Sequence, residues 1–229
     1  MTRPSHLFQS QADAGKFDKI ISLGCNCELT WNIRSHFGIE RAYPLDWWIT
    51  PFQALWKLLE TRFHDLFNVS NLEVSQDLLT VRDTYYNLLY HHDFKRTEDD
   101  KIIRDGLDQQ VPLLKQKYGM LTERFFRDPE NKRVLFVRNR DGNIPHLDRD
   151  TTPMDSTTFE QLYTLLEKLF PTSHISLLVT NCPVFPRVRR TKGDIRWDET
   201  ANYDDAQFFA GSPRGWREMF CRNNILYEE

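Results

Sequence analysis

Short apolar runs alternate along this chain with stretches that have the apolar spacing of amphipathic helices. Three of the runs are predicted to be buried strands, at residues 19–24, 133–137 and 174–179. Residues 79–90 mix β-branched and aromatic residues and are expected to contain another strand. Nearly continuous apolar strands that alternate with helices are typical of a parallel sheet covered on both faces. We therefore predict a single α/β domain over residues 17–229, with a mainly parallel sheet, preceded by a polar, flexible arm at residues 1–16.

Five helices are expected between and around these strands. The first follows Gly24 and ends at Gly38, and the second opens at Thr50-Pro51, with Thr50 as cap and Gln53 completing a capping box. The other three are expected around Val111 to Phe125, from about Thr157 and from Ser212. Residues 183–211 show no regular pattern and are expected to be irregular.

Composition excludes several classes of function. The chain has 30 basic and 33 acidic residues and a net charge of −3, whereas nucleic-acid binders concentrate positive charge to displace phosphate counterions. No stretch approaches the roughly 18 apolar residues of a membrane span, and the first residues lack the apolar core of a signal peptide. We expect a cytoplasmic protein that binds neither nucleic acid nor membrane.

The four cysteines are expected to be reduced thiols, because they are too few for a disulfide framework. One residue separates Cys25 from Cys27, whereas zinc ligands are usually two to four residues apart, and no second close Cys/His pair complements them. The sequence therefore predicts neither a metal nor another cofactor.

Polar side chains follow each predicted strand. In parallel sheets, ligands bind beyond the carboxyl ends of the strands, so these side chains are expected to gather at one edge. They are Cys25 and Cys27 after the first strand, His91 and His92 after the second, Arg138 to Asp141 after the third, and Asn181 after the fourth. Such a set is what a nucleophilic site needs, since a helix start and a nearby imidazole lower the pKa of a thiol. Each residue taken alone is equally compatible with packing or solvation.

Three N-terminal motifs carry a family resemblance. They are Ile21-Ser-Leu-Gly-Cys-Asn-Cys-Glu28, Ile33-Arg34 and Tyr43-Pro-Leu-Asp-Trp47. They resemble the opening of an uncharacterised, mostly bacterial domain family described as papain-like cysteine peptidases, with Leu45 in place of the usual phenylalanine. The segments Tyr90-His-His-Asp-Phe94 and Val134-Leu-Phe-Val-Arg138 resemble later elements of the same family. The likeness spans roughly residues 18 to 140.

The resemblance and the strand-end pattern together give the candidate site residues. Cys27 is the candidate nucleophile, with Cys25 as the fallback, and His92 is the general base, because His91 would face the other way along a strand. Asp46 is the preferred group to orient the imidazole, although an Asx turn or helix cap would explain it equally well. Asn26, Arg138, Trp47 and Asn181 are the candidate substrate-binding residues. Alternatively, Arg138 forms a salt bridge with Asp46 or Glu28. Trp47 is alternatively a core residue.

The leading functional prediction is a Cys-His hydrolase or acyltransferase that acts on an amide, ester or thioester bond of a small-molecule, peptide or glycan-linked substrate. A papain-type architecture would be α+β, with the nucleophile's helix packed on an antiparallel sheet, and is the alternative fold. An esterase-like hydrolase with a flavodoxin-like sheet is a second functional possibility, although Ser22 lies inside the predicted strand. The third is a non-catalytic module that binds an anionic sugar or nucleotide through Arg138, Arg140 and the basic segment 187–192, which is either a mobile lid or a solvated loop.

Overall fold

The computed structural model describes residues 15–139, 146–182, 184–207 and 209–228. Most of the predicted N-terminal arm lies outside these residues. The first described strand, β1 (Lys16–Phe17), pairs in parallel with the last one, β11 (Leu226–Tyr227), so the two ends of the described chain lie side by side. No helix among the described residues is long and apolar enough to cross a membrane.

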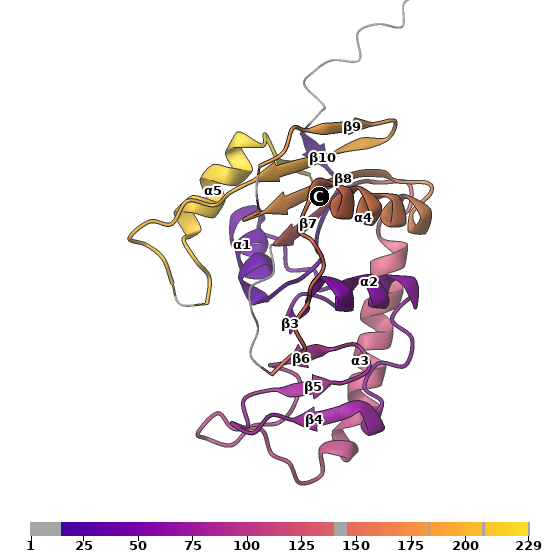
Figure 1. Cartoon of the computed structure of the whole chain (residues 1–229), viewed down its shortest axis with the longest axis vertical. Helices are drawn as coiled ribbons and strands as arrows, with labels where there is room; N and C mark the ends of the chain where they lie inside the picture. Colours follow the sequence, from indigo (N-terminus) through magenta and orange to yellow (C-terminus); the bar gives the residue numbers. More distant parts are fainter. Residues whose placement is uncertain (1–14, 140–145, 183, 208, 229) are drawn as a thin grey trace, which may run out of the picture.

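A five-stranded sheet organises the upper part of the molecule (Figure 1). Its strands lie in the order β2-β7-β8-β10-β9, and the first four are parallel, whereas β9 is antiparallel at the edge. Their bounds are β2 (Lys19–Ser22), β7 (Arg133–Asn139), β8 (His174–Thr180), β9 (Val188–Arg190) and β10 (Gly193–Asp198).

A separate four-stranded antiparallel sheet has the order β3-β6-β5-β4. The segment 79–90, expected as one strand of the parallel sheet, instead forms a hairpin of this second sheet. The hairpin turns at residues 84–87, where Asp83 accepts hydrogen bonds from the backbone N–H groups of Tyr85 and Tyr86, both 3.0 Å long. The bounds are β3 (Trp48–Ile49), β4 (Leu72–Val74), β5 (Val81–Asp83) and β6 (Leu88–Tyr90). The fold thus mixes helices with three sheets, and the expectation of a single mainly parallel sheet is not confirmed.

The helices cover both faces of the five-stranded sheet. Side chains alternate along β7, so Leu135 and Val137 join one apolar cluster with α1 and α5, while Val134 and Phe136 join a second cluster with α2, α3 and α4. This second cluster continues into the antiparallel sheet. Helix α3 lies beside that sheet and runs along the long axis of the molecule (Figure 1). The bounds are α1 (Cys27–Phe37), α2 (Phe52–Glu60), α3 (Leu107–Arg127), α4 (Ser156–Leu169) and α5 (Pro213–Arg222), with a 3-10 turn at Val69–Asn71.

Helix ends agree only partly with the motifs in the sequence. Gly38 ends α1 in the left-handed conformation, with φ 68°, as expected. The predicted Thr50 capping box is wrong, because α2 begins one residue later than that box requires and the Gln53 N–H donates to Asp150 Oδ2 at 2.8 Å. A carboxylate from a distant loop therefore takes the role predicted for Thr50.

Residues 183–211 are not irregular throughout, because they include the β9–β10 hairpin. The pattern was obscured by two charged residues in β10, Asp194 and Arg196, which are both buried and joined at 2.8 Å. Within the basic segment 187–192, residues Val188–Arg190 form the edge strand β9, and most side chains of the segment are exposed to solvent. Arg187 pairs with Asp194, and Arg190 pairs with Glu160.

Candidate functional site

The turn between β2 and α1 has an uncommon backbone. Gly24 and Cys25 have φ values of 76° and 101°, a region that side chains with a Cβ rarely adopt. The turn is held in place because Thr50 N–H donates to Cys25 O at 2.9 Å, and Gly24 N–H donates to Ser22 Oγ at 3.1 Å. This strained turn places Cys27 at the first position of α1.

The Cys27 thiol lies at a helix start that carries no side-chain cap. Asn26 precedes it in an extended conformation, and its side chain makes no capping hydrogen bond. Burial raises the pKa of Cys27, the charge of Glu28 raises it further, and hydrogen bonds from the N–H groups of Cys27 and Glu28 act in the opposite direction. A helix N-terminus stabilises an exposed anion by only about 0.3–1 kcal/mol, less than one pKa unit, so burial dominates here. The expectation of a lowered thiol pKa is wrong for the resting protein.

Asp46 is buried and bound by the helix that carries Cys27. Its carboxylate accepts hydrogen bonds from Arg34 Nη2 at 3.0 Å, Thr30 Oγ1 at 3.4 Å and Tyr43 N–H at 3.0 Å. Burial raises the pKa of Asp46 to about 6, although these three donors and the Arg34 charge lower it. Among the described residues no hydrogen bond joins Asp46 to His92. The contact with Tyr43 runs back three residues, so it is not an Asx turn, in which the side chain accepts from the N–H two residues on.

Trp47 lies between α1 and His92. The Arg34 guanidinium carbon is 5.3 Å from the centre of the Trp47 ring, and the His92 ring meets Trp47 edge-on at 5.9 Å. Asp46 is thus linked to His92 through Arg34 and Trp47. Because Cys27, Thr30 and Arg34 are spaced i, i+3 and i+7, this group lies along the same face of α1 as the thiol.

His91 and His92 follow β6 in a bend, so strand alternation does not separate them. Their ring centroids are 4.5 Å apart at an angle of 84°. The pKa of His92 is lowered by burial first and then by the charges of His91 and Arg96, which favours a neutral imidazole. No hydrogen bond joins Cys27 to His92 in the part of the chain that the structure describes. Next to His92, Asp93 accepts hydrogen bonds from Trp48 and Tyr118, which fixes the end of this segment.

Two predicted substrate-binding residues have structural partners. Arg138 is 1% exposed, and its two terminal nitrogens donate to Leu23 O and Thr50 O, each at 2.9 Å. It ties the end of β2 to the start of α2, which replaces the predicted salt bridge to Asp46 or Glu28. Asn181 donates to Asn139 Oδ1 at 2.9 Å and joins the ends of β8 and β7. Arg140 lies outside the described residues.

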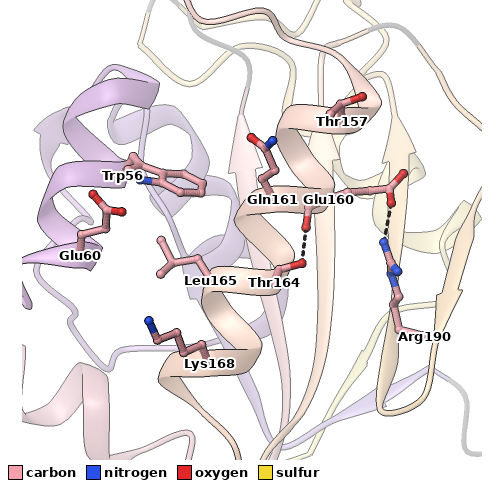
Figure 2. A pocket seen from close by; sticks show the side chains of 9 residues that line it. All are labelled: Trp56, Glu60, Thr157, Glu160, Gln161, Thr164, Leu165, Lys168 and Arg190. Carbon is pink, nitrogen blue, oxygen red and sulfur yellow. Dashed lines mark hydrogen bonds and ion pairs between the residues drawn. The ribbon is translucent and has the colours of Figure 1, made fainter.

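Two surface grooves lie away from these residues. One, of about 740 Å³, lies between α2, α4 and β9, with Trp56 facing Leu165 across it (Figure 2). The other, of about 760 Å³, lies between the end of α3 and the end of α4. Neither groove is lined by a predicted site residue. The described part of the chain also has no group of three or more His, Cys, Asp or Glu side chains placed to hold a metal ion.

Comparison with known proteins gives one family. Residues 18–146 match the model of the family described as "Putative papain-like cysteine peptidase", which is more than half of the 229 residues. The chain belongs to this family. No curated protein and no solved structure matches the chain. The family region holds Cys27, Asp46, His92 and Arg138, whereas Asn181 and α5 lie outside it.

Sequence reasoning missed two groups around Cys27. Arg34 was part of the resemblance but had no assigned role, although its i+7 spacing from Cys27 places it on the same helix face. Thr50 was assigned to a helix cap, but it is fully buried, and its Oγ1 has no hydrogen-bond partner among the described residues. The helical spacing of Arg34 was readable, whereas the contact between Thr50 and the Cys25 turn depends on tertiary structure.

Proposed function

We propose that this protein is a cysteine-dependent hydrolase or acyltransferase in which Cys27 attacks the carbonyl carbon of an amide, ester or thioester. The observation that carries the proposal is the position of Cys27 as the first residue of α1, at a helix start where the Asn26 side chain makes no capping hydrogen bond. Membership of the papain-like family supports the same assignment.

The start of α1 provides donors for the charge that develops in such a reaction. The first N–H groups of a helix have no partner within the helix, and the Asn26 side chain does not occupy them. When the sulfur bonds to a carbonyl carbon, the carbonyl oxygen is held close to these donors and becomes an oxyanion. We assign the backbone of Cys27 and Glu28 this role.

His92 is the proposed proton carrier. The sulfur of Cys27 bonds to the carbonyl carbon, its proton passes to neutral His92, and the carbonyl electron pair moves to oxygen. When the carbonyl re-forms, the bond to the leaving group breaks and His92 returns the proton to it. Water, deprotonated by His92, then cleaves the thioester in a hydrolase, whereas a second nucleophile takes its place in an acyltransferase.

The raised pKa of Cys27 and the lowered pKa of His92 favour a pair that is neutral in the resting state. The proton then moves during the attack, so a stored thiolate is not required. Asp46 contributes indirectly, because it holds Arg34 against Trp47 and Trp47 packs on His92. In this proposal Asp46, Arg34 and Trp47 are positioning residues.

The described residues give the alternatives less support. An anion-binding module would use Arg138 and the 187–192 segment, but Arg138 is buried on backbone carbonyls, and Arg187 and Arg190 are paired with carboxylates. A serine esterase would need an accessible serine after the first strand. Ser22 is 3% exposed, and its oxygen accepts a hydrogen bond from Gly24 N–H.

Acyl trapping tests the proposal. We would treat the protein with p-nitrophenyl acetate, map acetylated peptides by mass spectrometry, and compare wild type with Cys27→Ala and Cys25→Ala. The proposal predicts a thioester on Cys27 that is absent in Cys27→Ala and persists in Cys25→Ala. Acetylation confined to the exposed Cys221 would contradict it.

A further inference from the structure

Trp31 and Phe209 form an aromatic pair beside the candidate nucleophile. Their ring centroids are 6.0 Å apart and their planes meet at 85°, an edge-to-face contact. Phe209 is 52% exposed even though it touches another aromatic ring. Phe209 therefore keeps about half of its surface free for a ligand.

The helix places this pair next to Cys27. Trp31 follows Cys27 by four residues in α1, so the two side chains occupy the same face, one turn apart. Helical side chains also lean toward the N-terminus and cover the preceding turn. The indole of Trp31 consequently lies over the turn that begins with the Cys27 thiol.

The loop that carries Phe209 is fixed to the same helix. Asn32 Nδ2 donates to Ala210 O and to Glu28 O, both at 2.8 Å, and Trp216 Nε1 donates to Glu28 Oε1 at 3.0 Å. Gly211 has φ 59°, a conformation that favours glycine, and a Cβ there would lie 2.5 Å from Glu28 Oε1, so another residue would displace the Glu28 carboxylate. The exposed ring is therefore held at the site by a fixed backbone.

We propose that Trp31 and Phe209 form the apolar wall of the acyl subsite, which selects substrates with a large apolar or aromatic group close to the scissile carbonyl. This inference rests on the proposed function, since it assigns the specificity of the same cysteine. An acyl group bound to Cys27 would extend along α1 over the indole and reach the free face of Phe209. Neither residue is assigned a step of the reaction.

Two haloacetamides that share the same reactive group but differ in size test the inference. We would measure site-resolved alkylation rates with iodoacetamide and N-benzyl iodoacetamide at about pH 9, where thiolates are populated. The exposed Cys221 on α5 reports the intrinsic difference between the reagents in the same molecule. At Cys27 the benzyl reagent should gain about tenfold relative to Cys221, the scale of one aromatic contact.

Phe209→Ala and Trp31→Ala should each remove most of this gain. Tyr85 is 45% exposed and lies in the turn between β5 and β6, so Tyr85→Ala should keep the gain. If Cys27 shows no gain, or if the gain persists in Phe209→Ala, the subsite inference is wrong but the proposed function still stands. A Cys27 that reacts with neither reagent contradicts the proposed function, and the inference falls with it.

Discussion

The indole of Trp47 meets the imidazole of His92 edge-on, with ring centroids 5.9 Å apart and planes at 83°. The Arg34 guanidinium carbon lies 5.3 Å from the centre of the same Trp47 ring, and the guanidinium is paired with buried Asp46. In this arrangement a carboxylate, a guanidinium and an indole together replace the direct carboxylate–imidazole bond that was expected. The contact predicts that the environment of His92 depends on Trp47.

Trp47→Ala should raise the pKa of His92 toward the ordinary value of about 6.5, because burial is the main cause of its lowering. The titration of the imidazole C–H signals by NMR measures this directly. Trp56→Ala, which removes an indole from the groove between α2 and α4, is the matched control and should leave His92 unchanged. Equal His92 titrations in wild type and Trp47→Ala would contradict the packing role of Trp47.

Asp46 gives a pH dependence of stability with a defined sign. Burial raises its folded-state pKa to about 6, above the unfolded value of about 3.9, so the folded state binds the proton more tightly. The stability contributed by this proton is complete below about pH 4 and is lost as the pH rises through about 6. Asp46→Asn should remove that decline in urea unfolding series across this range.

Asp205→Asn is the control with the opposite sign. A hydrogen bond from Ser212 is the main cause that lowers the pKa of Asp205, so the stability it contributes is lost on acidification. An Asp46→Asn variant with the same pH profile as wild type would show that Asp46 does not titrate in this window.

Arg138 should act on stability, because its guanidinium bridges two buried carbonyl groups. Arg138→Met leaves Leu23 O and Thr50 O without these donors and should cost about 3 kcal/mol in the free energy of unfolding. Arg214→Met, which removes an exposed, solvent-screened ion pair with Glu218, should cost much less. Similar urea midpoints for the two variants would contradict the structural role.

Thr50 and Thr180 provide a matched pair of buried hydroxyl groups. Thr180 Oγ1 donates to Asn139 Oδ1 at 2.9 Å, whereas Thr50 Oγ1 has no partner among the described residues. Thr180→Val should destabilise the protein by about 1 kcal/mol, while Thr50→Val should be neutral or stabilising, since an unpaired buried hydroxyl is costly. Thermal unfolding compares them, and a larger loss for Thr50→Val would reveal a partner for its hydroxyl.

The pattern of apolar residues predicted most of the elements but not their assignment to sheets. In β7, all of Val134 to Val137 are apolar and both faces are buried, so the run is readable as a central strand. Residues 79–90 also contain apolar and aromatic residues, but Arg82, Asp83 and Asn87 interrupt them. The Asp83 side chain forms a local turn with the N–H groups of Tyr85 and Tyr86, a signal that the single-strand prediction overlooked.

The candidate site, like the fold, was only partly predictable from the sequence. Cys27 at a helix start was predictable, because the strand, the glycine and the helical spacing adjoin it. The direction in which the Cys27 pKa shifts was not predictable, because burial of the thiol depends on tertiary structure. The partners of Asp46 were equally hidden, because Thr30 and Arg34 are on a different element from Asp46 and Tyr43.

The central claim is that Cys27 reacts with help from a neutral His92, and the pH dependence of Cys27 acylation tests it most directly. We would follow thioester formation on Cys27 with p-nitrophenyl acetate from about pH 4 to pH 10 in wild type and His92→Gln. The account predicts a wild-type rate that rises through an apparent pKa below about 6.5, and a loss of this limb with about 100-fold slower acylation in the variant. Identical profiles, with only a thiolate limb above about pH 8.5, would contradict a role for His92.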